Sequence, residues 1–191
     1  MFKSKLECHG FIRAFLSTDV ESVALQVPRI SYVDAGRNKR RYTGDLLVRF
    51  SEKAMRRPLV IECKYASALQ KDSELVKKLK HVGQTLNQTG YDFEIQTERM
   101  IRKPDLRMMR FVFDHINNDP HPATVQILEC VATHGSLRVE SLIKSVTTDT
   151  ILGYQLIPEI WRLVARRELR VDFQENLDLS AKISLPVGMS S

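Results

Sequence analysis

Disulfide, membrane and secretion signals are scarce in this sequence. Its 191 residues contain three cysteines, and no apolar run approaches the ~20 residues that a membrane-spanning helix needs. The first residues lead into an acid-containing helical pattern rather than a long apolar signal segment. Cys8, Cys63 and Cys130 are widely spaced and set among apolar residues, which favours reduced core thiols over disulfides or a zinc site. We therefore expect a globular cytoplasmic protein with no membrane partner.

Acidic residues are outnumbered by basic residues in the first part of the chain. Residues 1–113 hold 22 Lys and Arg against 13 Asp and Glu, a net charge of +9, whereas residues 114–191 hold 7 against 10, a net charge of −3. A basic surface attracts a polyanion such as nucleic acid, and an acidic surface is a poor non-specific binder of it. The two parts of the chain are therefore expected to have different partners.

Hydrophobic periodicity predicts alternating helices and strands in the basic part. The predicted elements are a helix over residues 4–16, strands over 23–33, 41–50 and 58–64, a long amphipathic helix over 66–89 and a strand over 91–97. This order is typical of an α/β fold in which helices flank a mixed sheet.

A polar cluster rich in Asn, Asp and Pro at residues 117–122 predicts a linker. Beyond it we predict three short helices and then a hairpin, over residues 123–133, 137–146, 151–167 and 169–183. That succession is the outline of a small winged-helix-like domain. We therefore predict two domains, residues 1–113 and residues 114–191.

Two charged residues lie inside the predicted strand that begins at Pro58. Residues i and i+2 of a strand share a face, so Glu62 and Lys64 project together while Ile61 and Cys63 point the other way. Charges inside an otherwise apolar strand indicate either a functional site or an ion pair.

Asp45 is expected to join this pair. The polar loop Ser51–Arg57 predicts a hairpin, and closure near Lys53 would bring Asp45 opposite Glu62, with Cβ atoms about 5 Å apart. Two carboxylates so close repel unless one is protonated or a cation lies between them, and Mg²⁺ prefers such oxygen ligands. Lys64 could position or deprotonate a water, or stabilise charge on a phosphate.

An Asp followed by Glu-x-Lys is the pattern of the PD-(D/E)xK nuclease cores. It also occurs by chance, and the alternative is a cross-strand ion pair on a half-exposed sheet. The triplet alone leaves both interpretations open.

Further landmarks resemble TnsA, the endonuclease subunit of heteromeric TnsABC-type transposases, including those of CRISPR-associated transposons. The resemblance covers residues 4–111, with a weaker match of helix and wing pattern to about residue 185. The residues that carry it are Ser4-Lys-Leu-Glu7, Gln26-x-Pro28-x-Ile30-x-Tyr32, Tyr42-Thr-Gly-Asp45, Ile61-Glu62-Cys-Lys64 and Gln96-Thr-Glu98-x-x-Ile101-x-x-Pro104-x-Leu106.

The resemblance implies a restriction-endonuclease-like PD-(D/E)xK core, in which a Glu from a helix joins acids from strands around Mg²⁺, with Mn²⁺ able to substitute. Carried onto this sequence, the catalytic residues are Glu7, Asp45, Glu62 and Lys64, of which the three acids are the metal ligands. Glu7 has an alternative role, because Ser4 and Glu7 form the pattern of a helix capping box. Gln26 could orient a water or a phosphate, or it could simply face solvent or bond to the backbone.

One departure from the family lies beside the site, since the usual Pro ahead of the catalytic Asp is Gly44 here. Basic residues near the expected hairpins predict contacts with DNA phosphates rather than with bases, and their alternative is a solvated charge run. These residues are Arg37, Lys39, Arg40, Arg41, Arg56 and Arg57.

The resemblance implies a Mg²⁺-dependent DNA endonuclease subunit that cuts the 5′ strands at transposon ends during cut-and-paste transposition. It implies a TnsB-like transposase that breaks and joins the 3′ ends, and a TnsC-like AAA+ ATPase, in the bacterial cytosol and nucleoid. The acidic C-terminal domain is expected to bind one of these two proteins. A stand-alone restriction or repair nuclease and an inactive scaffold of the same fold stay open as alternatives.

Overall fold

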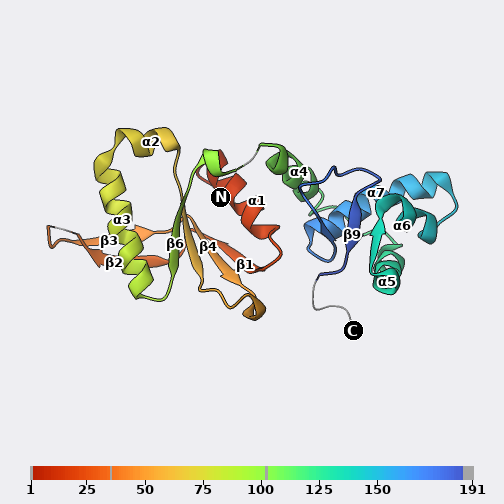
Figure 1. Ribbon diagram of the computed structural model, residues 1–191, viewed down its shortest axis with the longest axis horizontal. Helices are drawn as coiled ribbons and strands as arrows, with labels where there is room; N and C mark the ends of the chain where they lie inside the picture. Colours follow the sequence, from red (N-terminus) through yellow and green to blue (C-terminus); the bar gives the residue numbers. More distant parts are fainter. Residues whose placement is uncertain (1, 35, 102, 187–191) are drawn as a thin grey trace. The chain divides into compact units, whose positions relative to one another are not determined.

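The computed structural model describes residues 2–34, 36–101 and 103–186, and the chain forms two compact units, Met1–Arg102 and Lys103–Ser191 (Figure 1). The division differs from our predicted boundary at residue 113 because of helix α4 (Lys103–Phe113), which packs against α7 (Thr150–Ala165) in the second unit. The ring of Phe111 lies edge-on to Trp161, with 5.9 Å between centroids. Pro104 does not interrupt α4, because a proline is tolerated in the first turn of a helix.

The position of the boundary changes the division of charge. Unit 1, Met1–Arg102, holds 19 Lys and Arg against 12 Asp and Glu, a net charge of +7. Unit 2, Lys103–Ser191, holds 10 against 11, a net charge of −1. Unit 1 is therefore strongly basic, whereas unit 2 is close to neutral rather than clearly acidic.

Unit 1 is built on a mixed four-stranded sheet with the order β1-β4-β5-β6. Its strands are β1 (Val20–Leu25), β4 (Leu46–Phe50), β5 (Leu59–Cys63) and β6 (Asp92–Gln96). The first three strands pair antiparallel and β6 runs parallel to β5. A parallel neighbour requires a crossover connection, which is helical here. The predicted mixed sheet flanked by helices is confirmed.

The crossover consists of two helices, α2 (Ala66–Lys71) and α3 (Ser73–Gln88), where we predicted one. Asp72 divides them, because its backbone is extended and its carboxylate accepts a hydrogen bond from the backbone N–H of Leu75 at 2.8 Å. The first turn of α2 is held by Glu98, in the short 3₁₀ helix Glu98–Met100, whose Oε2 accepts from the N–H of Ala66 at 2.9 Å.

The two faces of the sheet pack against different helices. Leu46 lies beneath α1 (Lys5–Phe15), where a Cβ on Gly10 would come within 3.3 Å of Leu46 Cδ1. Its neighbour Leu47 points to the opposite face and joins the core beneath α3 with Val60. This alternation follows from the two-residue period of a strand.

A separate two-stranded ribbon, β2 (Arg29–Val33) with β3 (Lys39–Thr43), leaves the main sheet (Figure 1). We predicted that each of these strands would be continuous with a strand of the main sheet. The first is interrupted at Gln26, which has a positive φ of 55°, and at Pro28, which has no N–H to donate. The second is interrupted at Gly44 and Asp45.

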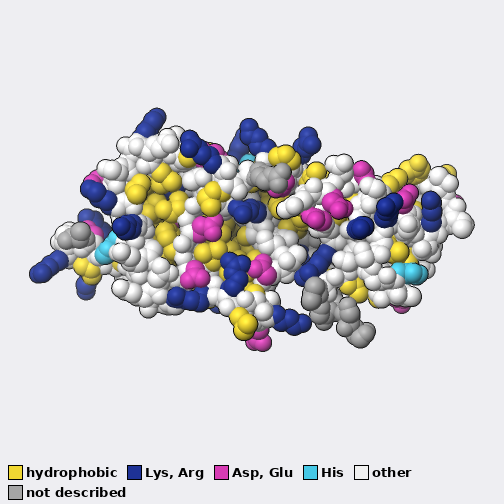
Figure 2. Space-filling view, viewed as in Figure 1, with side chains coloured by type: hydrophobic (Ala, Val, Ile, Leu, Met, Phe, Trp, Pro, Cys, Tyr) yellow, Lys and Arg dark blue, Asp and Glu magenta, His cyan; other side chains and the backbone are white. Residues whose placement is uncertain are grey.

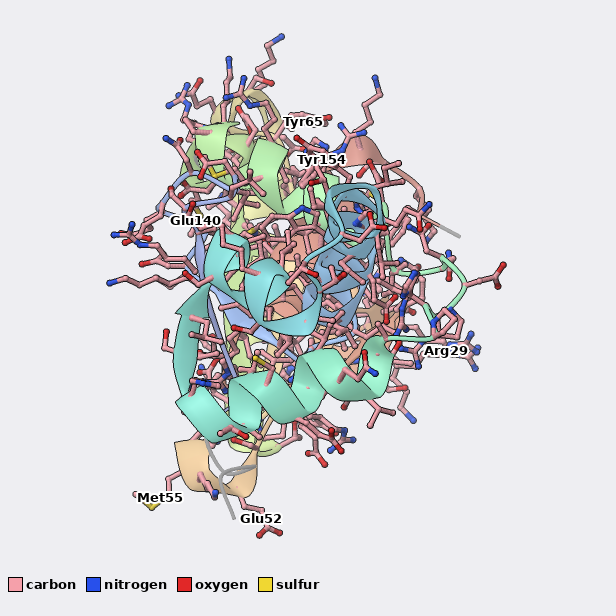
Figure 3. All side chains as sticks on the ribbon, turned by 90° about the vertical axis from the view of Figure 1, so that its right-hand side faces the viewer. Arg29, Glu52, Met55, Tyr65, Glu140 and Tyr154 are labelled. Atoms are coloured by element: carbon pink, nitrogen blue, oxygen red, sulfur yellow. The ribbon has the colours of Figure 1, made fainter. Side chains whose placement is uncertain are left out.

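The β4–β5 connection contains the short 3₁₀ helix Glu52–Ala54, close to the predicted point of closure. Met55 ends it with a positive φ of 46°, and Figure 3 shows Glu52 and Met55 projecting from this turn. The predicted hairpin that brings Asp45 toward Glu62 is therefore present.

Unit 2 contains α5 (Thr124–His134), β7 (Ser136–Arg138), α6 (Val139–Val146), α7, β8 (Arg170–Val171) and β9 (Lys182–Ser184). The strands form an antiparallel sheet with the order β7-β9-β8. The helices and the hairpin follow the predicted order, with the short strand β7 ahead of α6. The winged-helix assignment itself stays a prediction.

The core of unit 2 encloses an ion pair. Arg162 donates two hydrogen bonds to Glu159, from Nε at 2.7 Å and from Nη2 at 2.8 Å, and the hydroxyl of Thr124 donates to the same carboxylate. Burial alone would raise the pKa of Glu159, but the hydrogen bonds from Arg162 and Thr124 lower it below its ordinary value.

Among the helices of the described residues, none is long and apolar enough to cross a membrane.

Candidate nuclease site

Asp45 and Glu62 lie across from one another on adjacent strands. Leu46 pairs with Ile61 and Leu47 with Val60, so the next step of the β4–β5 register sets Asp45 opposite Glu62. Both carboxylates are buried, with 8% of Asp45 and 6% of Glu62 exposed. The shared volume that the sequence predicted for these two acids therefore exists.

Lys64 lies between the two acids. Its Nζ is 2.7 Å from Glu62 Oε1 and 4.0 Å from Asp45 Oδ2. Burial lowers the pKa of Lys64, but the hydrogen bond to Glu62 and the charges of Glu62 and Asp45 outweigh it and raise the pKa above its ordinary value. The ammonium group therefore compensates part of the repulsion between the two carboxylates.

Two further hydrogen bonds orient these carboxylates. The backbone N–H of Cys63 donates to Asp45 Oδ2 at 2.9 Å, and the hydroxyl of Tyr42 donates to Glu62 Oε2 at 2.6 Å. Burial, and then the charge of Glu62, raise the pKa of Tyr42, so this hydroxyl stays protonated as a donor. Sequence reasoning gave Tyr42 no role, although a buried tyrosine hydroxyl generally requires a hydrogen-bond partner.

Glu7 takes the capping role at the start of α1. Its backbone N–H donates to Ser4 Oγ at 3.1 Å, and Ser4 Oγ also donates to Glu7 Oε1 at 3.4 Å. The other oxygen, Oε2, accepts from the backbone N–H of Lys3 at 3.0 Å. Ser4 therefore caps the helix as its pattern predicted, whereas the Glu7 carboxylate bonds the backbone N–H of Lys3 rather than that of Ser4, which a full capping box would use.

The buried thiol of Cys63 lies within the electrostatic influence of all three predicted metal ligands. Burial, and then the negative charges of Asp45, Glu7 and Glu62, raise the pKa of Cys63 to about 12. Within the described ranges, however, no group of three or more His, Cys, Asp or Glu side chains is placed to hold a metal ion. The structure thus assembles two carboxylates and a lysine, with Glu7 nearby but hydrogen-bonded to its own helix terminus.

Comparison with known protein families identifies this region. Residues 17–98 match the family described as TnsA-like endonuclease N terminal. This part of the chain is a TnsA-like endonuclease domain. The match includes Asp45, Glu62 and Lys64, begins beyond Glu7, and indicates a nuclease of the transposase type. No curated protein matches the chain.

Gln26 borders the site of the TnsA-like domain through its backbone. Its N–H donates to the carbonyl oxygen of Asp45 at 2.9 Å, and its side-chain Oε1 accepts from Lys3 Nζ at 2.5 Å. Its buried Nε2 has no partner among the described residues.

Gln96 is also buried beside the site. Its backbone carbonyl oxygen accepts a hydrogen bond from the backbone N–H of Lys64 at 3.0 Å. Its side-chain Oε1 has no hydrogen-bond partner among the described residues.

The geometry at Gly44 explains why glycine replaces the family's proline. A Cβ at this position would lie 2.6 Å from Val60 Cγ1 and 2.9 Å from the carbonyl oxygen of Val27. The Gly44 N–H also donates to the carbonyl of Pro28 at 3.1 Å, a bond that a proline could not make. The close approach of these two segments therefore requires glycine here.

The basic residues predicted to contact DNA divide into two groups. Arg40 pairs with Asp34 at 2.9 Å, Arg56 pairs with Asp19 at 2.7 Å, and Arg57 donates to the carbonyl of Asn87 at 2.7 Å. These three cations therefore have interactions within the fold. Arg37, Lys39 and Arg41 are exposed, and within the described ranges none of them has an ion-pair partner.

Proposed function

We propose that this protein is a Mg²⁺-dependent DNA endonuclease subunit of a heteromeric transposase, which cuts the 5′ strands at transposon ends. The observation that supports the proposal is the pair of buried carboxylates, Asp45 and Glu62, with the ammonium group of Lys64 between them in a TnsA-like domain. An isolated surface ion pair would not require two acids to share one cation.

The donor set fits a hard divalent cation. Asp45 and Glu62 present carboxylate oxygens on one face of the sheet, which suit Mg²⁺ and also Mn²⁺. Glu7 would be the third ligand, at the expense of its hydrogen bonds to Ser4 and Lys3. When bound, the ion would polarise the scissile phosphate and lower the pKa of an attacking water.

The protein's own groups would orient the reacting atoms. The Tyr42 hydroxyl and the Cys63 N–H hold the two carboxylates in fixed orientations. Lys64 would turn from Glu62 toward the phosphate or the attacking water and stabilise the negative charge that develops there. Its backbone N–H is bonded to Gln96, so the end of β5 that carries it is fixed.

Unit 2 would serve as the protein-binding part, with a TnsB-like transposase or a TnsC-like ATPase as its partner. In α7, Ile151 and Tyr154 are 73% and 66% exposed, and none of residues 150–161 is Lys or Arg. A hollow of about 460 Å³, lined in part by Ile143, Ile157 and Leu179, lies beside this helix. A helix that binds DNA would carry cations, so this apolar surface supports protein contact even for a winged-helix-like unit.

Substitution of the central residues tests the proposed chemistry. In a reconstituted transposition reaction with Mg²⁺, Asp45→Ala and Lys64→Ala are each expected to lower 5′-strand cleavage by at least about 10²-fold while 3′ joining continues, because a charge at the reacting phosphate is lost. Glu74→Ala and Lys77→Ala remove an exposed ion pair of the same charge types from α3 and should leave cleavage unchanged. Persistence of 5′ cuts in the Asp45 and Lys64 variants would refute the site.

The same reaction separates the two alternatives. Cutting by the purified chain alone in Mg²⁺ would identify a stand-alone nuclease. DNA binding without cutting under every partner combination would identify an inactive scaffold.

A further inference from the structure

The β2–β3 ribbon has two chemically different faces. The register pairs Arg29 with Thr43, Ser31 with Arg41 and Val33 with Lys39, so these side chains share one face. All six of these residues are exposed. Three of them are cations and none is an acid.

The opposite face fixes the ribbon to unit 1. Tyr32 and Tyr42 are buried in the core beneath α3, and the Tyr32 ring lies 5.6 Å from that of His81. His81 Nε2 is also 2.5 Å from the carbonyl oxygen of Val33. The outer face is therefore presented by a ribbon held along its length rather than by a free loop.

The turn at the end of the ribbon is also structured. The carboxylate of Asp34 accepts from the Asn38 N–H and from Arg40 Nε, each at 2.9 Å, while Arg37 adopts a positive φ of 63°. Arg40 therefore forms an ion pair within the ribbon. The three cations of the outer face, Arg29, Lys39 and Arg41, have no ion-pair partner in the part of the chain that the structure describes.

The spacing of these cations matches a regular polyanion. The cations lie at three successive levels of the ribbon, which are two residues, or about 7 Å, apart. Lys39 lies at the first level and Arg41 at the second. Arg29 lies at the third, opposite Thr43, which is called the Thr43 level. Phosphates along one strand of B-DNA follow at about 3.4 Å of helix axis, so each step of the ribbon corresponds to about two phosphates. A two-stranded ribbon also fits the major groove, which is about 12 Å wide.

The ribbon begins at the nuclease site itself. Asp45 follows Thr43 by two residues, and Tyr42 on the inner face donates its hydroxyl to Glu62. Figure 1 shows the ribbon extending from the main sheet beside α3, and Figure 2 shows Lys and Arg side chains around its outer end. Arg29, labelled in Figure 3, points outward.

We propose that the outer face of the β2–β3 ribbon lies along the DNA duplex beside the cut and contacts its phosphates through Arg29, Lys39 and Arg41. This inference rests on the proposed function and adds the position of the duplex. The two steps from Lys39 to the Thr43 level span about 14 Å, so these contacts extend over about four base pairs on one side of the scissile phosphate.

Salt-dependent binding of the full chain to a synthetic DNA duplex, in metal-free buffer, tests the proposal. The triple variant Arg29→Gln, Lys39→Gln, Arg41→Gln should bind more weakly. The plot of log affinity against log salt has a negative slope, and the magnitude of that slope should decrease by about 3, one for each lost phosphate contact. The control is Lys71→Gln, Lys78→Gln, Lys80→Gln, which removes the same charge from exposed positions on α2 and α3 of the same unit. Its slope should decrease by less than about 1.

Equal decreases in the two triple variants would overturn the proposal, because the ribbon would then act only through net charge. A hydroxyl-radical footprint provides a second measurement, in which the ribbon variant should lose protection over about four base pairs on one side of the cut. If 5′ cleavage depends on Asp45 but the ribbon variant behaves like the control, the ribbon inference fails and the proposed function stands. If the unaltered chain binds no DNA, the ribbon inference fails, and the reconstituted reaction with Asp45→Ala decides separately whether the proposed function stands.

Discussion

At the scale of single residues, the site depends on groups that hold its carboxylates in place. Glu62 is bonded to Tyr42 on one oxygen and to Lys64 on the other, and Asp45 is bonded to the Cys63 N–H. Hydrogen bonds to charged groups contribute about 1.5–3 kcal/mol each, so these contacts are large enough to determine which orientation the carboxylates adopt. Tyr42 is therefore a positioning residue for Glu62.

Tyr42→Phe tests this role. The variant keeps the ring, which lies edge-on to Phe93 with 6.3 Å between centroids, and removes only the hydroxyl. We expect a loss of about tenfold in the cleavage rate and a higher Mg²⁺ concentration at half-maximal activity, because one bond to a charged group is worth at least about 1.5 kcal/mol. Rates measured across a Mg²⁺ titration provide both values.

Tyr32→Phe is the matched control, since this tyrosine is buried in the same core and on the same face of the ribbon. Thermal unfolding should show that both variants are folded. Identical Mg²⁺ titrations for the two variants would assign Tyr42 to packing alone.

At the scale of elements, α5 and α7 are joined in unit 2 by a buried charge network. Glu159 and Arg162 are buried, and Thr124 of α5 donates to the Glu159 carboxylate. Removal of one partner from such a pair leaves an uncompensated charge in the core, which costs about 3–5 kcal/mol. The network therefore makes the stability of unit 2 sensitive to pH.

The direction of that pH dependence follows from the lowered pKa of Glu159. Its contribution is fully present above the ordinary value of 4.5 and is lost as the pH falls through the lower folded-state pKa. Glu159→Gln should destabilise unit 2 by about 3–5 kcal/mol at neutral pH. Below pH 4.5, the stability of this variant should change with pH less than the stability of the unaltered protein does. Urea unfolding followed by the fluorescence of Trp161, the chain's single tryptophan, reports on this unit.

Glu140→Gln is the control, because Glu140 is a half-exposed acid whose Oε1 lies 3.9 Å from Arg138 Nη1. It should change the stability by less than about 1 kcal/mol. A Glu159 variant whose unfolding follows that of the unaltered protein at every pH would contradict the role of the network.

At the scale of the whole molecule, charge and packing distinguish the two units. Each unit has its own hydrophobic core, around Val60, Leu79 and Leu86 in unit 1 and around Leu142, Leu156 and Ile160 in unit 2. The net charges are +7 and −1. DNA attraction is therefore expected to reside in unit 1.

Separate expression of the two units tests this division. Residues 1–102 should bind duplex DNA with nearly the salt dependence of the full chain, and residues 103–191 should bind it at least about tenfold more weakly at low salt, because counterion release requires clustered cations. Binding measured by fluorescence anisotropy, with circular dichroism to establish folding, provides the comparison. Comparable binding by the isolated second unit would contradict the assignment.

Local patterns were sufficient to predict the central pair of acids. Side chains alternate with a period of two, and the polar loop between the strands limits where the hairpin can close, so Asp45 and Glu62 were predicted to face one another. The same period predicted that Lys64 shares a face with Glu62. The helix cap at Ser4 and Glu7 was also predicted, because capping involves only neighbouring residues.

Contacts between segments distant in sequence had to be supplied by the fold. The two predicted strands are interrupted at Gln26 and at Gly44, and these interruptions create the ribbon. The Tyr42 hydroxyl reaches Glu62 only because the ribbon packs against α3. The division of the basic residues into paired cations and a free outer face likewise depends on register and on partners such as Asp19 and Asn87. The alternation of residue types along each strand and the start of each helix can be predicted from the residues alone, since those preferences are local. Which groups meet depends on folding, because hydrogen bonds and ion pairs act over a few ångströms between segments that are distant along the chain.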